Sequence, residues 1–331
     1  MDVVLDTNIF REDFLMDSSR FRILFDYLRK TDSKVVMPQI VYEEIAAVYE
    51  REISDRLEIF KKAKRNLEGA LIDGEVQDFD ISIAPEVKKY LGFLRSKLKI
   101  SSKDIVSYKN SYLEEVVRRA TRRVRPCSEK GEEFRDALLW LTVLDIARIA
   151  DHRMLIFISN NVKQFASEEG CLHPTLLREA EDEDLSIRYY NSLSHFIKEH
   201  ATRIDYITPK WLRSAIHTSA INDSFTKLLR RSGEDRLLHW ARRQGKEPTG
   251  RVFPYSSLLG LDDFHVYEMT DGSIYVEASY SGAVMVEFEW EEGEFECLYP
   301  VVTVTIEIAV DDKKVKSFEI VDWDFRYPWS M

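Results

Sequence analysis

The opening stretch, MDVVLDTNIF, places a carboxylate directly after an apolar run. Residues Val3–Leu5 are typical of a short buried strand, and Asp6, Thr7 and Asn8 follow it at once. In an open parallel α/β sheet, ligands bind at the carboxyl ends of the strands. Asp6 is therefore a candidate for binding or catalysis at that edge. The alternative is an ordinary helix N-cap, because Asp, Thr and Asn all cap helices well.

Three further segments carry acids or amides that could meet Asp6. In MPQIVYEEI, Glu43 and Glu44 lie on the opening turns of an expected helix. In GEEFRDALLWL, Asp136 lies on the apolar side of another expected helix, where a charge is costly unless it is paired or bound to a metal. In FISNNVKQF, a strand ends in the Ser-Asn-Asn of residues 159–161. Clustered carboxylates are how proteins hold Mg²⁺ or Mn²⁺, so the sequence suggests one of these ions as cofactor.

The first two-thirds of the chain alternates strand-like and helix-like segments. Expected strands lie at 3–5, 33–38, 154–159 and 185–191. Expected helices lie from 41 to about 71 and at 85–99, 104–123 and 131–150, with a short one ending near 200. Such alternation predicts an α/β fold, a largely parallel sheet covered by helices on both faces.

Four motifs, in order and in matching structural settings, resemble the PIN-domain nucleases, which are relatives of the flap endonucleases. They are VVLDTNIF, PQIVYEEI, EFRDALLW and SNNVKQF, and the resemblance covers about residues 1–200. It implies a Rossmann-like three-layer α/β/α fold with a central parallel sheet of four or five strands. It also implies metal-dependent cleavage of phosphodiester bonds, most often in single-stranded or structured RNA.

The resemblance also implies roles for particular residues. The metal-binding and catalytic residues would be Asp6, Glu44, Asp136 and Asn161. Their supporting neighbours would be Thr7, Asn8, Ser159 and Asn160. Asn161 departs from the family pattern, since many members have Asp there, and Gln164 stands where an acid is common. These departures remove negative charge and should weaken the hold on the metal.

Each assignment has a competing structural interpretation. Asp6 could be a capping acid, and Asp136 could be a helix-edge residue paired with Arg135 or with another neighbour. Glu44 could be a solvated first-turn acid favoured by the helix dipole, an interpretation about as strong as metal binding. Asn161 could be an ordinary turn asparagine.

A compact run of arginines precedes the expected helix that carries Asp136. It consists of Arg118, Arg119, Arg122, Arg123 and Arg125, with no acid between residues 116 and 125. A phosphate backbone approaching an acidic site needs such a positive patch. The alternative is a solvated face partly paired with Glu114 and Glu115. A second, weaker candidate lies around Arg230, Arg231, Arg242 and Arg243.

Composition and charge limit the class of protein. The chain has 331 residues with 44% hydrophobic content, which indicates a folded globular protein. Its three cysteines are widely spaced and lack a C-x-x-C pair, which favours a reducing, cytoplasmic location over a disulfide framework. We expect a soluble protein with no membrane contact, because no apolar run reaches spanning length.

The character of the chain changes after about residue 200. Residues 201–254 are expected to form a basic helical linker region with a net charge of about +5 for 201–250. Residues 255–331 are expected to form an acidic antiparallel β domain, since 251–331 carry a net charge of −12. A Thr-Asp-Gly-Ser segment between alternating runs is a strong hairpin signal. The acidic sheet should repel nucleic acid, so it is a candidate for a protein partner or for self-association.

The leading hypothesis is a Mg²⁺- or Mn²⁺-dependent endoribonuclease with an added β domain. RNA is expected as the substrate rather than DNA only because of the family resemblance. The rival hypothesis is a non-catalytic PIN-like module that binds RNA or protein, motivated by the amide in the fourth position of the site.

Overall fold

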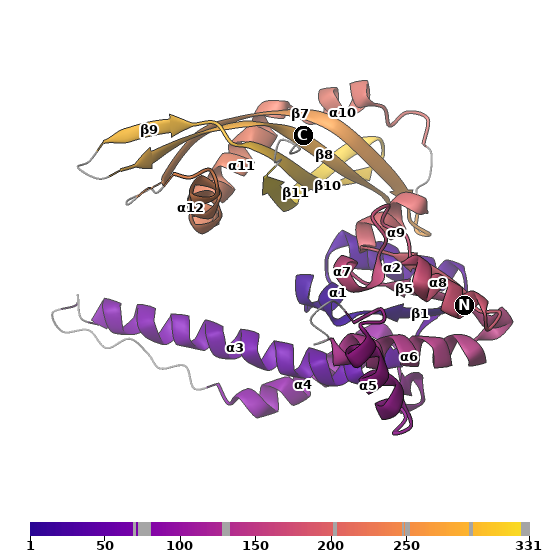
Figure 1. Ribbon diagram of the computed structural model, residues 1–331. Helices are drawn as coiled ribbons and strands as arrows, with labels where there is room; N and C mark the ends of the chain where they lie inside the picture. Colours follow the sequence, from indigo (N-terminus) through magenta and orange to yellow (C-terminus); the bar gives the residue numbers. More distant parts are fainter. Residues whose placement is uncertain are drawn as a thin grey trace. The chain divides into compact units, whose positions relative to one another are not determined.

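The chain forms two compact units, Met1–Glu199 and His200–Met331 (Figure 1). The computed structural model describes residues 1–68, 71, 81–127, 133–200, 204–246, 248, 252–290 and 294–325. None of the helices in these ranges combines the length and the hydrophobicity that spanning a membrane requires.

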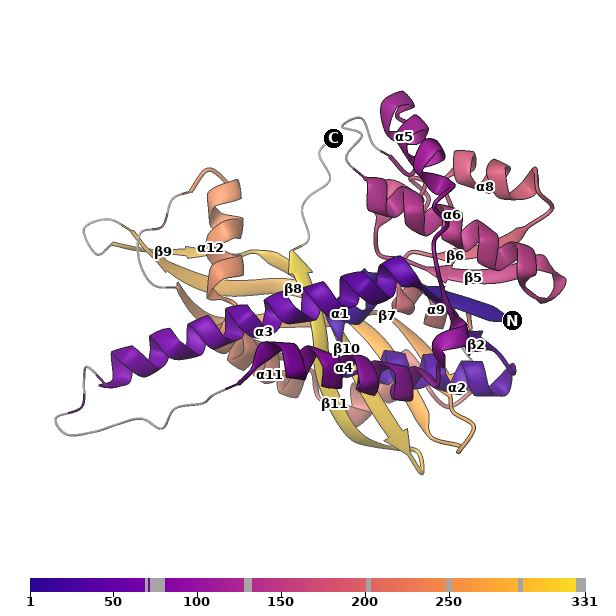
Figure 2. The same cartoon turned by 90° about the horizontal axis from the view of Figure 1, so that it is seen from below.

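The first unit alternates strands and helices from its first residues onward. In order, it contains β1 (Asp2–Leu5), α1 (Thr7–Glu12), α2 (Ser19–Lys30), β2 (Lys34–Val35), β3 (Met37–Pro38), α3 (Gln39–Glu68), α4 (Ile83–Leu98), η1 (Ser102–Asp104), β4 (Ile105–Val106), α5 (Tyr112–Arg122), α6 (Phe134–Ile149), η2 (Asp151–Arg153), β5 (Met154–Ile158), α7 (Val162–Phe165), α8 (Pro174–Glu181), β6 (Ser186–Tyr190) and α9 (Leu193–Glu199). The long α3 and α4 run side by side in both views (Figures 1 and 2).

A parallel sheet of four strands, in the order β2-β1-β5-β6, forms the centre of this unit. Its middle strands are continuous apolar runs, as expected for a sheet buried on both faces, and Val3, Val4 and Phe157 are 0% exposed. Helices α2 and α9 lie on one face and α5 and α6 on the other (Figure 1). The predicted three-layer α/β/α fold with a central parallel sheet is confirmed.

Several element boundaries differ from the sequence-based prediction. The strand expected at 33–38 is two short strands, because β2 pairs with β1 whereas β3 pairs with β4. The helix expected at 104–123 begins only at Tyr112, since Ser101 and Asp104 form a capping box around η1 and the chain then enters β4. The expected helices at 41–71 and 131–150 correspond to α3 and α6, and positions 69, 70, 131 and 132 lie outside the described residues.

In the described part of the second unit, three helices pack against an antiparallel sheet, and the predicted antiparallel character is confirmed. Its elements are α10 (Pro209–Ala215), α11 (Thr218–Ser232), α12 (Glu234–Arg243), β7 (Val252–Glu268), β8 (Ile274–Glu289), β9 (Phe295–Leu298), β10 (Val301–Asp311) and β11 (Lys314–Phe325). The strand order is β11-β10-β8-β7, with β9 also paired to β8.

The helices and the sheet of this unit share one hydrophobic core. Phe225 and Leu229 of α11 and Leu237 of α12 are buried in the same cluster as Val286 of β8 and Ile306 of β10. The helical segment expected as a linker at 201–254 therefore packs on the strands instead of standing apart from them.

The strands also begin earlier than the sequence analysis expected. Within the β domain expected at 255–331, the sequence pattern indicates strands only from Phe264 onward, whereas β7 begins at Val252. Two register shifts, between Pro254 and Ser256 and between Leu261 and Asp263, interrupt the alternation of side chains along β7. Alternation is the main sequence signal of a strand, so the bulged segment escaped detection.

Candidate active site

Asp6 lies at the carboxyl end of β1, where the chain turns into α1. Its backbone N–H donates to the carbonyl of Ile158 at 2.9 Å, which brings the ends of β1 and β5 together. Its carboxylate caps α1 by accepting from the Thr7 backbone N–H at 2.7 Å and also accepts from the Ser159 hydroxyl at 2.5 Å. Asp6 is therefore an N-cap and a candidate site residue at once. Burial raises the pKa of Asp6 to about 6, and the nearby charge of Glu44 adds to this effect. The hydrogen bond from Ser159 acts in the opposite direction.

Asp136 faces the same region from the first turn of α6. The side chain is buried, with the residue 6% exposed, although the helix starts only two residues earlier. Burial and the negative charge of Asp6 raise the pKa of Asp136 to about 7, against the charge of Arg135 and a hydrogen bond from Asn161. Two carboxylates that resist ionising together mark a place prepared for a positive charge.

Glu44 joins the cluster from the second turn of α3. Its Oε2 accepts from the Thr7 hydroxyl at 2.9 Å, and its Oε1 pairs with Arg135 Nη1 at 2.5 Å. Arg135 thus pairs with Glu44 and not with Asp136 as the competing interpretation supposed. Glu43 lies elsewhere, accepting from Gln39 on the exposed surface at 2.6 Å.

The segment after β5 brings its two asparagines to different places. Asn161 caps α7, with its backbone N–H donating to the Ser159 hydroxyl at 3.1 Å and its side chain hydrogen-bonded to Asp136. The Asn160 amide donates instead to Glu12, and its carbonyl Oδ1 is buried with no partner among the described residues. Asn8 is half-buried on the first turn of α1.

The donor set fits a hard divalent cation only in part. Asp6 and Asp136 supply two carboxylates, and an amide oxygen such as that of Asn161 is also a ligand for such ions. Glu44, by contrast, has both oxygens engaged. Among the residues that the structure describes, no group of three His, Cys, Asp or Glu is arranged to hold a metal. The charge of Arg135 and a hydrogen bond from Asn161 partly offset the negative charge of the cluster.

The order of these elements is also that of a known family. A family model of the PIN domain matches residues 3–165, a range that includes all four candidate residues. The N-terminal unit is a PIN domain, the family that its sequence motifs resemble. PIN domains are usually nucleases and typically use divalent metals. Searches of curated proteins and of solved structures gave no match.

The arginine run near the PIN-domain site divides into paired and available members. Arg119 is 2% exposed and pairs with Glu115 and Glu179, so its predicted contact with phosphate is corrected to a structural role. Arg118 forms two hydrogen bonds with Glu115, each of 2.6 Å. Arg119 shares one face of α5 with the buried Tyr112 and Val116, but the sequence alone did not show that this face packs against α6.

The other three members of the run are exposed or half-buried at the end of α5. Arg122 and Arg123 are exposed, and Arg123 has a left-handed backbone that ends the helix. The Arg125 guanidinium donates to the carbonyl of Lys163 in α7. Because α7 begins directly after Asn161, this contact brings a positive charge beside the candidate site.

Tyr189 is a residue of the PIN-domain site that sequence reasoning missed. Its hydroxyl donates to the Ser159 carbonyl at 2.8 Å, which fixes the turn that carries both asparagines. Burial and the charge of Asp6 raise the pKa of the Tyr189 hydroxyl well above its usual range. The sequence places Tyr189 in a strand but holds no signal that this strand, β6, lies beside β5.

Proposed function

We propose that this protein is a divalent-metal-dependent endoribonuclease whose site is built on Asp6 and Asp136. The observation that carries the proposal is the pairing of these two buried carboxylates, each with a pKa raised to about 6 or 7. A protein gains nothing in stability from such a pair, whereas a site for a divalent cation requires it.

The residues around the pair have definable roles. Asp6 and Asp136 would hold the ion, with the amide oxygen of Asn161 as a neutral third ligand. Ser159 and Thr7 fix the Asp6 carboxylate through their hydrogen bonds. When bound, a divalent ion lowers the pKa of a coordinated water and stabilises the oxygens of an in-line phosphodiester displacement.

Glu44 and Arg135 add an ion pair at the edge of this cluster. Their contact of 2.5 Å keeps the Glu44 carboxylate turned toward Arg135, whose side chain is 56% exposed. An approaching phosphate would attract Arg135, because phosphate and carboxylate bind a guanidinium in the same geometry. If Arg135 exchanged Glu44 for the phosphate, the Glu44 carboxylate would be free to turn toward the ion.

The substrate strand would approach past Arg122, Arg123 and Arg125. These side chains supply positive charge beside a site that repels phosphate by itself. The preference for RNA over DNA rests on the resemblance to PIN nucleases. The three cysteines, none of them in a disulfide, support a cytoplasmic location.

A non-catalytic PIN module that binds RNA or protein is the second candidate. The engagement of Glu44 by Thr7 and Arg135 favours it, because that arrangement leaves two acids and an amide for the ion. The acidic strands of the second unit would then be the surface for a protein partner or for self-association.

Calorimetric titration with Mn²⁺ separates the two candidates. A nuclease should bind Mn²⁺ saturably, lose that binding in Asp6→Asn and keep it in Glu43→Gln, which alters an exposed neighbouring acid. A mixed panel of RNA and DNA, incubated with and without EDTA, then tests cleavage. Saturable binding with no cleavage of any substrate would favour the binding module, and absence of both would refute the metal site.

A further inference from the structure

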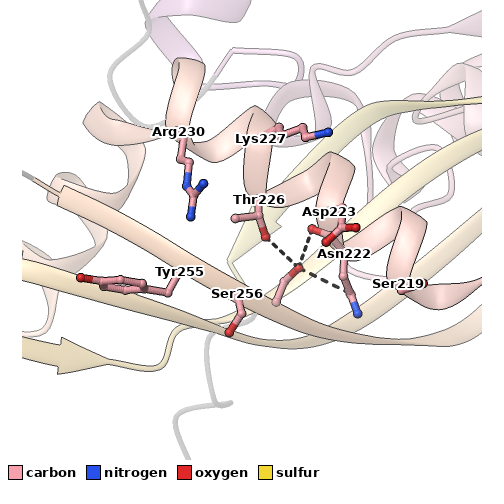
Figure 3. Close-up of a pocket in the computed structure, with 9 residues that line it drawn as sticks. Ser219, Asn222, Asp223, Thr226, Lys227, Arg230, Tyr255 and Ser256 are labelled. Carbon is pink, nitrogen blue, oxygen red and sulfur yellow. Dashed lines mark hydrogen bonds between the residues drawn. The ribbon is translucent and has the colours of Figure 1, made fainter.

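A cavity of about 450 Å³, lined by polar and charged residues, lies in the second unit between α11 and β7 (Figure 3). Its size is within the range of cavities that bind small organic ligands. Helix α11 contributes Ser219, Asn222, Asp223, Thr226, Lys227 and Arg230, and β7 contributes Tyr255, Ser256 and Ser257. This cavity belongs to the unit that the PIN-domain match does not cover.

Two cations on one face of α11 border the cavity. Lys227 and Arg230 are three residues apart, so they occupy neighbouring positions on the helix surface. Arg230 extends from α11 toward β7, and its Nε donates to the Pro254 carbonyl at 2.9 Å (Figure 3). This bond holds the guanidinium in place and leaves its two terminal nitrogens for a ligand. Within the described part of the chain, neither cation forms an ion pair with an acid.

The floor of the cavity is made of buried hydroxyl groups. Thr226 is 7% exposed and Ser257 is 4% exposed. The Ser257 hydroxyl donates to the Asn222 backbone carbonyl at 3.1 Å, while the Thr226 hydroxyl has only a 3.4 Å contact with Ser257. The Thr226 hydroxyl can therefore form a further hydrogen bond with a polar ligand in the cavity.

An aromatic ring closes the end of the cavity next to Arg230. Tyr255, which lies near Arg230 in Figure 3, is 49% exposed. Its hydroxyl donates to Glu287 on β8 at 2.7 Å, which restrains the ring. A half-exposed ring held beside an arginine offers a stacking surface next to an anion-binding group. Proteins that bind single-stranded nucleic acid combine these two elements.

We propose that this cavity binds a nucleoside phosphate, with the phosphate against Arg230 and Lys227 and the base on Tyr255. Inorganic anions satisfy only the cationic half of the site, and uncharged aromatic ligands only the other half. The single acid of the lining, Asp223, is exposed and lies one turn before Lys227, where it accepts hydrogen bonds from ribose hydroxyls. The inference is independent of cleavage by the PIN domain, since it concerns binding alone.

Equilibrium binding of the full chain to three probes tests the proposal. The probes are a 5′-mononucleotide, a short fluorescent oligoribonucleotide and inorganic phosphate, all measured with EDTA present so that the PIN-domain site is not loaded. Arg230→Gln should weaken nucleotide binding about tenfold or more, because it removes a charge-assisted contact. Arg231→Gln is the matched control, since it removes an exposed arginine of the same helix that does not line the cavity.

A second set of variants tests the aromatic half and does not depend on the Arg230 bond to Pro254. Tyr255→Leu should weaken binding about five- to a hundredfold, the range of one stacked base, whereas Tyr255→Phe keeps the ring and most of the affinity. Asp223→Asn should strengthen binding of inorganic phosphate by removing a repulsive charge, but it should weaken nucleotide binding, because the asparagine amide accepts more weakly from the ribose hydroxyls.

The three probes also identify the source of the phosphate. Binding of the mononucleotide that depends on Arg230 and Tyr255 indicates a free nucleotide ligand. Binding of the oligoribonucleotide alone, with the same dependence, indicates a strand that passes through the second unit. Equal affinity for inorganic phosphate, or equal loss in Arg230→Gln and Arg231→Gln, would overturn the proposal.

Discussion

The most direct test of the carboxylate pair is the substitution Asp136→Asn, read as stability at two pH values. In the folded protein, burial and the charge of Asp6 hold the pKa of Asp136 at about 7, against 3.8 when it is unperturbed. Above neutral pH the folded protein therefore carries an ionised carboxylate that it disfavours, whereas the unfolded chain ionises freely. The asparagine keeps the volume and the oxygen that accepts from Asn161, but it has no charge.

The pKa difference sets the size and the sign of the effect. At 1.36 kcal/mol per pH unit, a pKa raised by about 3 destabilises the folded state by about 4 kcal/mol at pH 8. The folded state binds the extra proton, so this penalty grows as pH rises from the unfolded pKa to the folded pKa and is complete above the latter. At about pH 4.5 the same relation gives a destabilisation of only about 1 kcal/mol. Asp136→Asn should thus stabilise the metal-free protein strongly at high pH and little at low pH.

Urea unfolding followed by circular dichroism, in the presence of EDTA, measures both free energies. Asp145→Asn on the same helix is the matched control with the opposite sign. Burial of Asp145 is outweighed by hydrogen bonds from Lys109 and Tyr112, and its pKa is lowered. Removal of that charge should destabilise the protein at pH 8, with the loss shrinking as pH falls. If Asp136→Asn changed the free energy of unfolding by the same amount at both pH values, the reasoning would be refuted.

Three further predictions concern activity and substrate. Asp6→Asn should abolish metal-dependent cleavage while the circular dichroism spectrum stays that of the native fold, and unchanged turnover would rule out the site as proposed. Asn161→Asp places a third carboxylate beside Asp136 and should lower the Mg²⁺ concentration needed for half-maximal activity. Asn160→Asp should lower it less, because Asn160 faces Glu12. Identical activity curves for the two variants would refute the ligand assignment. Replacing Arg122 and Arg123 by Gln should reduce the slope of log K against log salt for single-stranded RNA by about 1.4, at about 0.7 per phosphate contact, and an unchanged slope would mean that these arginines are only a solvated surface.

Local patterns in the sequence determined the fold class and the candidate acids of the first unit. Apolar runs that end in Asp6 or in the Ser-Asn-Asn of residues 159–161 indicate buried parallel strands with polar groups at their carboxyl ends. The carboxyl ends of parallel strands lie at the same edge of a sheet, so these polar groups were expected to lie close together. The structure brings Asp6, Ser159 and Asp136 into one region, joined by hydrogen bonds and by mutual effects on pKa.

Only the tertiary structure decided which charged groups are available and which are engaged. Periodicity gives the face of a helix but not its partner, and for this reason the burial of Arg119 and its ion pairs with two glutamates could not be foreseen. The pairing of Glu44 with Arg135 joins α3 to α6, whose sequence positions lie far apart. The two register shifts of β7 interrupt the alternating pattern that would have indicated the start of this strand. These features depend on long-range packing, which no local pattern encodes.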